Sequence, residues 1–216
     1  MKPALAVIAK APAPGRSKTR LCPPCTPQEA ARLAEAALRD TLAAMLAAPT
    51  TARRVLVLDG SPGRWLPPGV EVIAQRGPGL AERLAAAFDD IGAPAFLVGM
   101  DSPQVTPHLL AAGVAAVERD GAALGMAWDG GYWGIGLRVS QPAAFAGVPM
   151  SVASTGAIQL DRLRALGLQP ARLAVLDDVD VIADARAVAR QAPAGQFAAA
   201  LATIEPAIAA RARVAA

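Results

Sequence analysis

A short basic loop is the first feature of the sequence that could do chemistry. Residues 11–20 (APAPGRSKTR) follow an apolar run of strand length and contain Gly15, Arg16, Lys18 and Arg20. Glycine lets the backbone approach a ligand closely, and arginine and lysine donate charge-assisted hydrogen bonds to phosphate oxygens. The spacing differs from that of a Walker A loop. The loop therefore predicts a phosphate-binding site, with a solvated basic turn as the alternative.

Two aspartates each follow an apolar run, and together they predict a metal site. Asp101 stands in Gly-Met-Asp-Ser-Pro, and Asp129 is followed by Gly130 and Gly131, which permit a tight turn beside a ligand. Taken singly, Asp101 could equally cap the next turn, and Asp-Gly before a strand is a common hairpin signal. If the strands before them are parallel, both carboxylates meet at one sheet edge. There they could hold Mg²⁺ or Mn²⁺ across a diphosphate.

Two further polar segments are weaker candidates for the same site. Gln75 and Arg83 flank a Gly-Pro-Gly stretch that opens a helix, where backbone N–H groups could receive a base edge or a phosphate. A plain Gly-Pro turn explains this spacing equally well. Asp178 and Asp180 follow a late apolar run and are secondary candidates, with a strand-end turn of solvated carboxylates as the alternative.

The cysteines and the single histidine predict no chemistry of their own. Cys22 and Cys25 have the spacing of a redox pair before a helix, but no second pair is present to complete a zinc site. His108 stands one residue into a predicted helix and is expected to be a surface or helix-terminus residue.

Apolar runs of strand length alternate with longer alanine-rich helical runs along the chain. Thr26-Pro27-Gln28-Glu29 is a capping box that opens the first long helix. The pattern predicts strands at 5–8, 55–58, 70–73, 95–98, 123–127, 132–138 and 173–176, and helices at 27–48, 79–91, 107–119 and after 180. This alternation predicts an α/β fold with a mostly parallel sheet, helices on both faces and a ligand site at the carboxyl ends of the strands.

Length and composition limit the class of protein. With 216 residues, 54% hydrophobic and 18% charged, the chain is expected to form a single domain over residues 1–208, with a frayed end at 209–216. A net charge of +3 is small for a nucleic-acid-binding protein, and no uncharged stretch suits a membrane-spanning helix. The first apolar run ends at Lys10, which disfavours a secretion signal, so the cytoplasm is the expected location.

Taken in order, these motifs resemble one bacterial protein family. They are Gly15–Leu21, Gly99–Pro103, Asp129–Trp133 and Asp178–Asp180, with a Ser/Thr-Gly segment at Ser151–Gly156. The chain resembles, over roughly residues 4 to 200, the uncharacterised glycosyltransferase-A-like proteins, also described as radical-SAM/selenodomain-associated transferases. It is similar at a distance to the guanylyltransferases of molybdenum-cofactor and deazaflavin-cofactor synthesis, the latter the 2-phospholactate guanylyltransferases.

The resemblance implies a nucleotide-diphospho-sugar transferase fold (GT-A, Rossmann-like), with a mixed, mainly parallel sheet and a nucleotide site at its carboxyl edge. In that fold the loop matching Gly15 to Arg20 approaches the nucleotide phosphates, and the position of Asp101 is the usual metal ligand. The sequence departs from the family pattern at Pro78-Gly79 and at Ala81, where glycine is frequent. The departure leaves open which base is held.

The leading hypothesis is a metal-dependent transferase that uses a nucleotide-activated sugar as donor. Lys18 and Asp129 are the expected catalytic residues, and Asp101 and Asp129 the expected ligands of Mg²⁺ or Mn²⁺. The expected nucleotide-binding residues are Gly15, Arg16, Lys18, Arg20, Gln75, Arg83, Gly130 and Gly131. One alternative is a nucleotidyltransferase that joins a nucleoside triphosphate to a phosphorylated acceptor and releases pyrophosphate. Another is a nucleotide-binding protein without catalytic activity.

Overall fold

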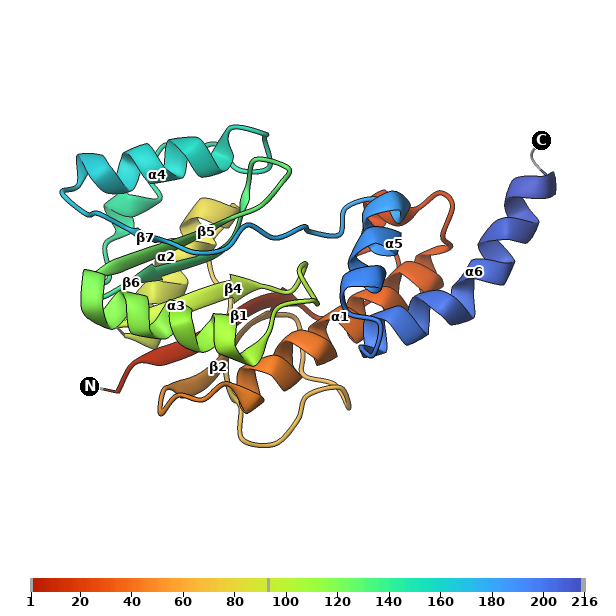
Figure 1. The fold of residues 1–216 in the computed structure, drawn as a ribbon, viewed down its shortest axis with the longest axis horizontal. Coiled ribbons are helices and arrows are strands. Elements are labelled where there is room, and N and C mark those ends of the chain that lie inside the picture. Colours follow the sequence, from red (N-terminus) through yellow and green to blue (C-terminus); the bar gives the residue numbers. More distant parts are fainter. Residues whose placement is uncertain (1, 93, 215–216) are drawn as a thin grey trace.

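A seven-stranded sheet forms the centre of the computed structural model, which describes residues 2–92 and 94–214 (Figure 1). The strands are β1 (Ala4–Lys10), β2 (Arg53–Asp59), β3 (Glu71–Ala74), β4 (Ala95–Gly99), β5 (Ala122–Met126), β6 (Tyr132–Leu137) and β7 (Ala171–Arg172). The helices are α1 (Pro27–Ala47), α2 (Leu80–Ile91), α3 (Pro107–Asp120), α4 (Thr155–Ala165), α5 (Ile182–Gln191) and α6 (Gln196–Val214), with short 3-10 turns η1 (Thr19–Leu21) and η2 (Pro142–Ala144).

The strand order β3-β2-β1-β4-β6-β5-β7 creates a switch point in the middle of the sheet. β1 pairs in parallel with β2 and β4, β2 with β3, and β5 with β7, whereas β6 runs antiparallel to β4 and β5. The chain moves from β1 outward to β2 and β3, and later places β4 on the other side of β1. Open α/β sheets bind ligands beyond the strand ends at such a point. The predicted mainly parallel α/β sheet is confirmed.

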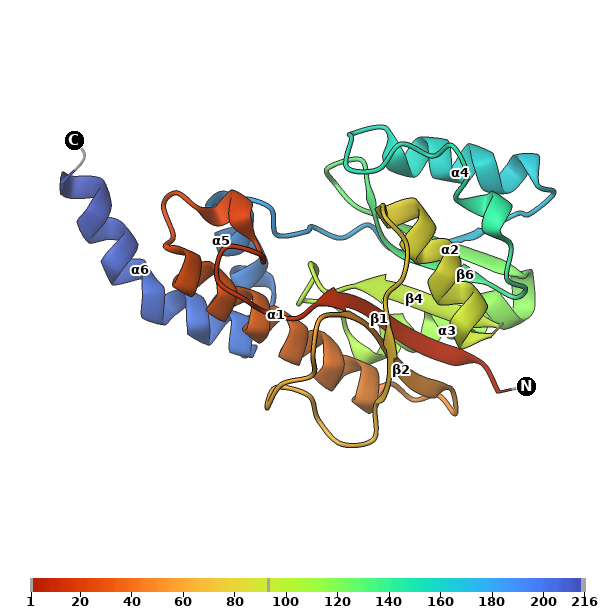
Figure 2. The same cartoon turned by 180° about the vertical axis from the view of Figure 1, so that it is seen from behind.

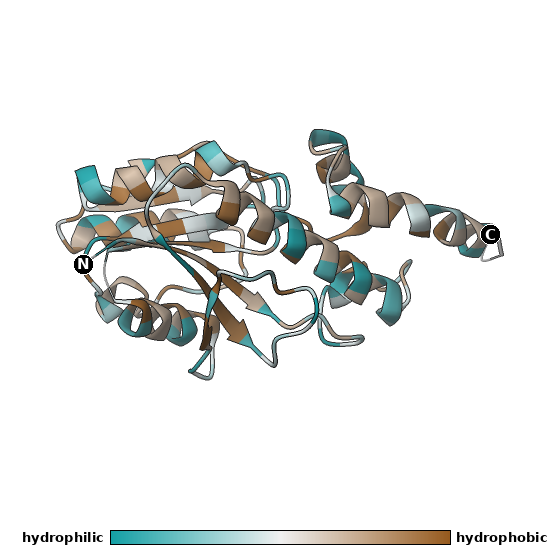
Figure 3. Ribbon diagram, turned by 90° about the horizontal axis from the view of Figure 1, so that it is seen from below, coloured by the Kyte–Doolittle hydropathy of each residue, from teal (hydrophilic) through white to brown (hydrophobic). Residues whose placement is uncertain are grey.

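Helices cover both faces of the sheet, as the sequence predicts (Figures 1 and 2). On one face the second half of α1 packs with α3 against the strands, through residues such as Leu38 and Leu110. On the other face α2 and α4 pack through Phe88 and Leu163. Figure 3 shows the hydrophobic residues gathered on the strands and on the inward sides of these helices. Burial of this apolar surface is the main stabilising contribution to the fold.

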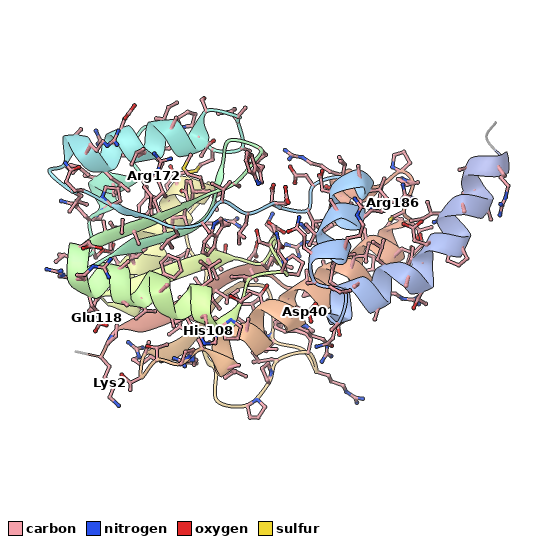
Figure 4. The ribbon with its side chains drawn as sticks, in the orientation of Figure 1. Lys2, Asp40, His108, Glu118, Arg172 and Arg186 are labelled. Atoms are coloured by element: carbon pink, nitrogen blue, oxygen red, sulfur yellow. The ribbon has the colours of Figure 1, made fainter. Side chains whose placement is uncertain are left out.

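The helices after residue 180, which the sequence predicts as a cover for a closing strand, pack away from the sheet instead. α5 and α6 contact the first half of α1 and form a third hydrophobic cluster beyond the sheet edge (Figure 1). Asp40 of α1 accepts hydrogen bonds from the backbone N–H groups of Gln196 and Phe197 at 2.9 and 2.8 Å, and so caps the start of α6. Arg186 of α5 forms a bidentate ion pair with Glu205 of α6. Figure 4 labels Asp40 and Arg186 within this helical lobe.

Two boundaries near the end of the chain differ from prediction. The strand expected at 173–176 is β7 at 171–172, and residues 173–176 follow β5 as extended chain. Two isolated backbone bonds continue the contact, from Leu173 N to Leu124 O at 3.0 Å and from Leu176 N to Met126 O at 3.2 Å. α6 extends to Val214, so residues 209–214 are helical, while residues 215 and 216 lie outside the described part. Among the described residues, no helix is both long enough and apolar enough to cross a membrane.

Candidate functional site

A cavity of about 680 Å³ opens at the carboxyl edge of the sheet. Its walls come from the ends of β1 and β4, from the turn between β5 and β6, and from two segments that lead to the helical lobe: the basic loop of residues 11–20 and the segment 177–181, here called the strap. Figure 1 shows both segments running from the sheet to the lobe. The cavity therefore lies at the switch point between β1 and β4.

The basic loop is held in shape by its own hydrogen bonds and places Lys18 in the cavity wall. The Ser17 hydroxyl accepts from the backbone N–H of Ala13 at 3.2 Å and donates to the carbonyl of Ala11 at 3.3 Å. Lys18 has a left-handed backbone (φ 51) and a side chain that is only 7% exposed. A non-glycine residue in this conformation is uncommon and carries strain. The loop is thus a built structure and not a loose basic turn.

Lys18 joins three segments that are far apart in the sequence. Its ammonium lies 2.6 Å from Asp101 Oδ1, at the end of β4, and also donates a hydrogen bond to the carbonyl of Val179 in the strap. The backbone N–H of Val179 donates in turn to the carbonyl of Asp101 at 2.9 Å. Lys18 and Asp101 therefore meet at the carboxyl edge of the sheet, where the sequence predicts them.

Three carboxylates gather beside this network. Asp129, Asp178 and Asp180 each offer one oxygen, and these oxygens all lie within 4.8 Å of one another. Burial, together with the neighbouring charges of Asp129 and Asp180, raises the pKa of Asp178 to about 6. Arg20 partly offsets the negative charge, because its Nη1 lies 2.5 Å from Asp180 Oδ2. Asp101 lines the same cavity but lies outside this group of three, and its carboxylate contacts Lys18.

The donor set of this carboxylate cluster (Asp129, Asp178 and Asp180) fits a hard divalent cation. Carboxylate oxygens are the ligands that Mg²⁺ and Mn²⁺ prefer. Oxygens on opposite sides of an ion with bonds near 2.1 Å are about 4.2 Å apart, so oxygens within 4.8 Å need only a small inward movement. Raised carboxylate pKa values in a cleft are also typical of functional sites.

The turn that carries Asp129 is fixed by close backbone contacts. Asp129 Oδ1 accepts from the N–H of Gly131 at 2.8 Å, within the hairpin that joins β5 to β6, so the hairpin reading of Asp-Gly is also correct. Gly130 has φ 89, and a Cβ there would lie 1.8 Å from the carbonyl oxygen of Ala153. Its own carbonyl accepts from the N–H of Gly156 at 2.8 Å. The start of α4 therefore braces the turn beside the carboxylate cluster.

Arg83 is held in the cavity wall by Asp59, the last residue of β2. Arg83 Nη1 lies 3.0 Å from Asp59 Oδ2, and Arg83 Nε donates to the carbonyl of Gly77 at 3.1 Å. Gln75 Nε2 donates to the carbonyls of Ala9 and Val57 at 2.7 and 3.1 Å. These bonds orient the amide of Gln75 so that its oxygen faces Arg83 Nη1, at 3.4 Å.

Most of the residues predicted for the site line the one cavity. They are Arg16, Lys18, Arg20, Gln75, Arg83, Asp101, Asp129 and Gly131. Gly15 and Gly130 are not among the lining residues, although each has a positive φ in a turn beside it. Asp178 and Asp180, secondary in the sequence, are central in the structure. The sequence analysis missed Asp59 and Lys10. Asp59 could have been found as an acidic residue at the end of a predicted strand, and Lys10 as the basic residue that ends β1.

The cysteine pair and the histidine lie outside the cavity lining. Burial raises the pKa of both Cys22 and Cys25, with a further contribution from the nearby Glu29. A raised pKa keeps a thiol protonated and disfavours redox or nucleophilic chemistry. His108, labelled in Figure 4, is an exposed residue at the start of α3.

Comparison with known proteins supplies a family and a set of similar folds. The model of a family described as "Uncharacterized protein conserved in bacteria (DUF2064)" matches residues 30–152, which include Asp101 and Asp129. A search of curated proteins finds no match. A crystal structure from Desulfovibrio desulfuricans G20, described as a "putative nucleotide-diphospho-sugar transferase", is 26% identical with a TM-score of 0.85, covering 98% of this chain and 99% of that one.

Two more distant structures share the fold alone. One is a CMP:2-keto-3-deoxy-manno-octonic acid synthetase in complex with CTP, 12% identical with a TM-score of 0.56, covering 89% of this chain and 99% of that one. The other is Rv0371c of Mycobacterium tuberculosis H37Rv in complex with manganese, 20% identical with a TM-score of 0.52, covering 87% and 98%. The predicted fold class and family resemblance are confirmed. The predicted enzyme class, a transferase, agrees with the description of the Desulfovibrio structure.

Proposed function

The chain belongs to the DUF2064 family, and from that premise and the geometry of its cavity we propose that it is a metal-dependent transferase whose donor is a nucleotide-activated sugar. One observation carries the proposal: a basic loop of the kind that binds phosphate and a cluster of three carboxylates line the same cavity, at the switch point of the sheet. The description of the similar Desulfovibrio protein supports the choice of donor.

The charges that line the cavity suit a diphosphate that arrives with a divalent cation. Five cationic side chains (Lys10, Arg16, Lys18, Arg20 and Arg83) and four carboxylates (Asp101, Asp129, Asp178 and Asp180) line it. A dianionic diphosphate and a divalent cation, bound together, leave this near balance unchanged. Either one bound alone would be opposed by charges of its own sign.

The basic loop is placed to hold the leaving group. In sugar transfer, an acceptor hydroxyl passes its proton to a base, for which Asp129 is the candidate, and its oxygen forms a bond to the sugar carbon. The bond from that carbon to the diphosphate oxygen breaks, so negative charge grows on the diphosphate. Lys18 and Arg16 offer hydrogen-bond donors that stabilise this charge. Asp129, Asp178 and Asp180 are the residues that would hold Mg²⁺ or Mn²⁺, which supplies Lewis-acid stabilisation of the leaving diphosphate when bound. Asp101 holds Lys18 in position.

Nucleotidyl transfer is the second candidate, because the same cations could surround a triphosphate. In that reaction an acceptor oxygen attacks the α-phosphorus of a nucleoside triphosphate, and the bond to the β-phosphate breaks to release pyrophosphate. Four of the five cavity cations come from the loop after β1 and from the end of β1, which favours a ligand with a long phosphate chain.

Product analysis separates the two reactions. Purified protein is incubated with Mn²⁺ and, in turn, with nucleotide-sugars and with nucleoside triphosphates, and the release of nucleoside diphosphate is followed against that of pyrophosphate. Sugar transfer, or hydrolysis of the donor in its place, yields the diphosphate; nucleotidyl transfer yields pyrophosphate. If the protein binds nucleotides but releases neither product from any donor, it is a nucleotide-binding protein without catalytic activity.

Matched lysine variants test the residue roles in the same experiment. Lys18→Ala is expected to weaken nucleotide binding at least tenfold, because a charge-assisted contact to phosphate is lost. Lys2→Ala is the control, since Lys2 lies exposed near the chain start, away from the cavity (Figure 4). Equal nucleotide affinity in the two folded variants would show that the phosphate role of the loop is wrong.

A further inference from the structure

Arg20 takes part in both halves of the cavity, the basic loop and the carboxylate cluster. It belongs to the loop of residues 11–20 and lines the cavity, so it is one of the cations available to a diphosphate. In this structure, however, its Nη1 lies 2.5 Å from Oδ2 of Asp180, one of the three residues that would hold a divalent cation. The same guanidinium is therefore suited to a phosphate and paired with a carboxylate that suits the cation.

The two partners of this ion pair differ in how firmly they are held. Asp180 belongs to the strap, where the N–H of Val179 donates to the carbonyl of Asp101 at 2.9 Å and the N–H of Asp180 donates to Asp184 Oδ2 at 3.2 Å. The side chain of Arg20 is 61% exposed, and among the described residues its hydrogen bond is the one to Asp180. The arginine side chain is thus the partner that can move.

The ion pair between Arg20 and Asp180 is also the easier of the two pairs of the loop to break. Both of its side chains are well exposed, at 61% and 40%, and exposed ion pairs contribute little to stability because water and salt screen them. Lys18 is only 7% exposed and contacts both Asp101 and the strap. A ligand can therefore draw Arg20 away at little cost while Lys18 keeps the loop and the strap together.

The charges predict when Arg20 changes partner. A divalent cation that enters the carboxylate cluster alone meets the positive charge of Arg20 beside Asp180, and the two cations repel each other. A diphosphate that arrives with the cation offers Arg20 oxygens of higher negative charge than a carboxylate already bound to the cation. Movement of Arg20 to the diphosphate then removes the repulsion. By linkage, each ligand raises the affinity of the cavity for the other by the same factor.

We propose that Arg20 is a binding residue that exchanges partners, from Asp180 before the ligands bind to the diphosphate afterwards, so that the cation and the diphosphate bind as a pair. This inference rests on the proposed function, since it assumes that a diphosphate and a divalent cation share the cavity. It adds an order of binding: the metal–diphosphate complex is the ligand that the cavity takes up, in preference to the bare metal.

Two binding measurements on Arg20→Ala test the exchange, with Mn²⁺ alone and with a premixed equimolar complex of Mn²⁺ and pyrophosphate as probes. Free Mn²⁺ is followed by electron paramagnetic resonance, and binding of the complex by calorimetry. The variant should bind Mn²⁺ alone about fivefold more tightly than the wild type, because the opposing charge is gone. It should bind the complex about fivefold more weakly, because a charge-assisted bond to phosphate is lost.

Two further variants serve as controls. Arg16 belongs to the same loop and lines the cavity, whereas the ion pairs of the loop in the described part of the chain are those of Lys18 and Arg20. Arg16→Ala should therefore weaken binding of the complex and leave the affinity for Mn²⁺ alone within about twofold of the wild type. Arg20→Lys keeps the positive charge and should stay close to the wild type in the measurement with Mn²⁺ alone.

Opposite changes for the two probes are the signature of the exchange. If Arg20→Ala bound both probes more tightly, the arginine would remain on Asp180 when the diphosphate binds; if it bound both more weakly, the arginine would serve only to keep the site in shape. Either result, an unchanged affinity for Mn²⁺ alone, or an equal gain in Arg16→Ala would overturn the inference and leave the proposed function standing. A wild-type protein that fails to bind the complex of Mn²⁺ and pyrophosphate would contradict the proposed function itself.

Discussion

Replacement of Asp178 by asparagine should make the protein more stable at neutral pH. The pKa of Asp178 rises from its usual 3.8 to about 6, chiefly through burial and through the nearby Asp129 and Asp180. A shift of roughly two units corresponds to at most about 3 kcal/mol, and because the side chain is only partly buried we expect about 1 kcal/mol after solvent screening. For a chain of this length that is a rise of about 2–4 °C in Tm.

The sign of the pH dependence follows from the direction of the shift. A carboxyl with a raised pKa binds its proton more tightly in the folded state than in the unfolded state. Its contribution to stability is therefore fully present below about pH 4 and is lost as the pH rises through about 6. The Asp178→Asn variant lacks this loss. Its advantage over the wild type should be absent at pH 4 and complete at pH 7.5, in urea denaturation with a chelator present.

A divalent cation should reverse the order of the two proteins. At a hundredfold excess over its Kd, an ion stabilises the folded state by about 2.7 kcal/mol, a gain that the asparagine variant largely forgoes. Asp161→Asn is the matched control, since Asp161 lies on α4 with a side chain 76% exposed. It should stay within about 0.5 kcal/mol of the wild type and keep the response to Mn²⁺. The reasoning would be refuted if Asp178→Asn were less stable than the wild type without metal. It would also be refuted if the difference in the free energy of unfolding between the two proteins were the same at pH 4 and pH 7.5.

Three further variants test other parts of the structure. Gly130→Ala should lower the free energy of unfolding by about 2 kcal/mol or more, because a Cβ there would lie 1.8 Å from the Ala153 carbonyl oxygen; an unchanged urea midpoint would disprove that close approach. A double variant with serine at Cys22 and Cys25 should keep nucleotide binding and turnover, since burial raises the pKa of both thiols, and lost activity in reducing buffer would point to a role for them. Asp40→Ala should cost about 1 kcal/mol and speed amide exchange at the start of α6, and exchange that changes only in the sheet would argue against the cap.

The fold was predictable from the sequence where local chemistry decides it. The capping box at Thr26 and Glu29 is present, with both of its hydrogen bonds. Apolar runs of four to seven residues became the buried strands β1, β2 and β4. The placement of α5 and α6 was not predictable in this way, because an amphipathic pattern shows that a helix buries one face but not which element covers it. The irregular path of residues 173–180, first along β5 and then as the strap, has no periodic signal either.

The candidate site was likewise predictable only in part. Lys18 and Asp101 follow strands whose ends meet at one edge, so parallel topology alone brings them together. The cluster of Asp129, Asp178 and Asp180 depends on the strap, whose course is set by single backbone bonds such as Val179 to Asp101. Asp59 reveals its role only through Arg83, a contact between side chains 24 positions apart.

Features that are unfavourable for folding converge on one cavity, and this convergence is the strongest physical argument that the cavity binds a ligand. Among the described residues, the non-glycine residues with positive φ are Lys18 and Ser151, and both line it. Asp178, which lines it too, has its pKa raised by burial and like charge, whereas ion pairs lower the pKa of Asp90 and Glu205 elsewhere. Local strain and like-charge repulsion persist where a bound ligand compensates for them. A loop that served only to connect β1 to α1 would not need a left-handed lysine, and a strap that served only to reach α5 would not need two carboxylates beside Asp129.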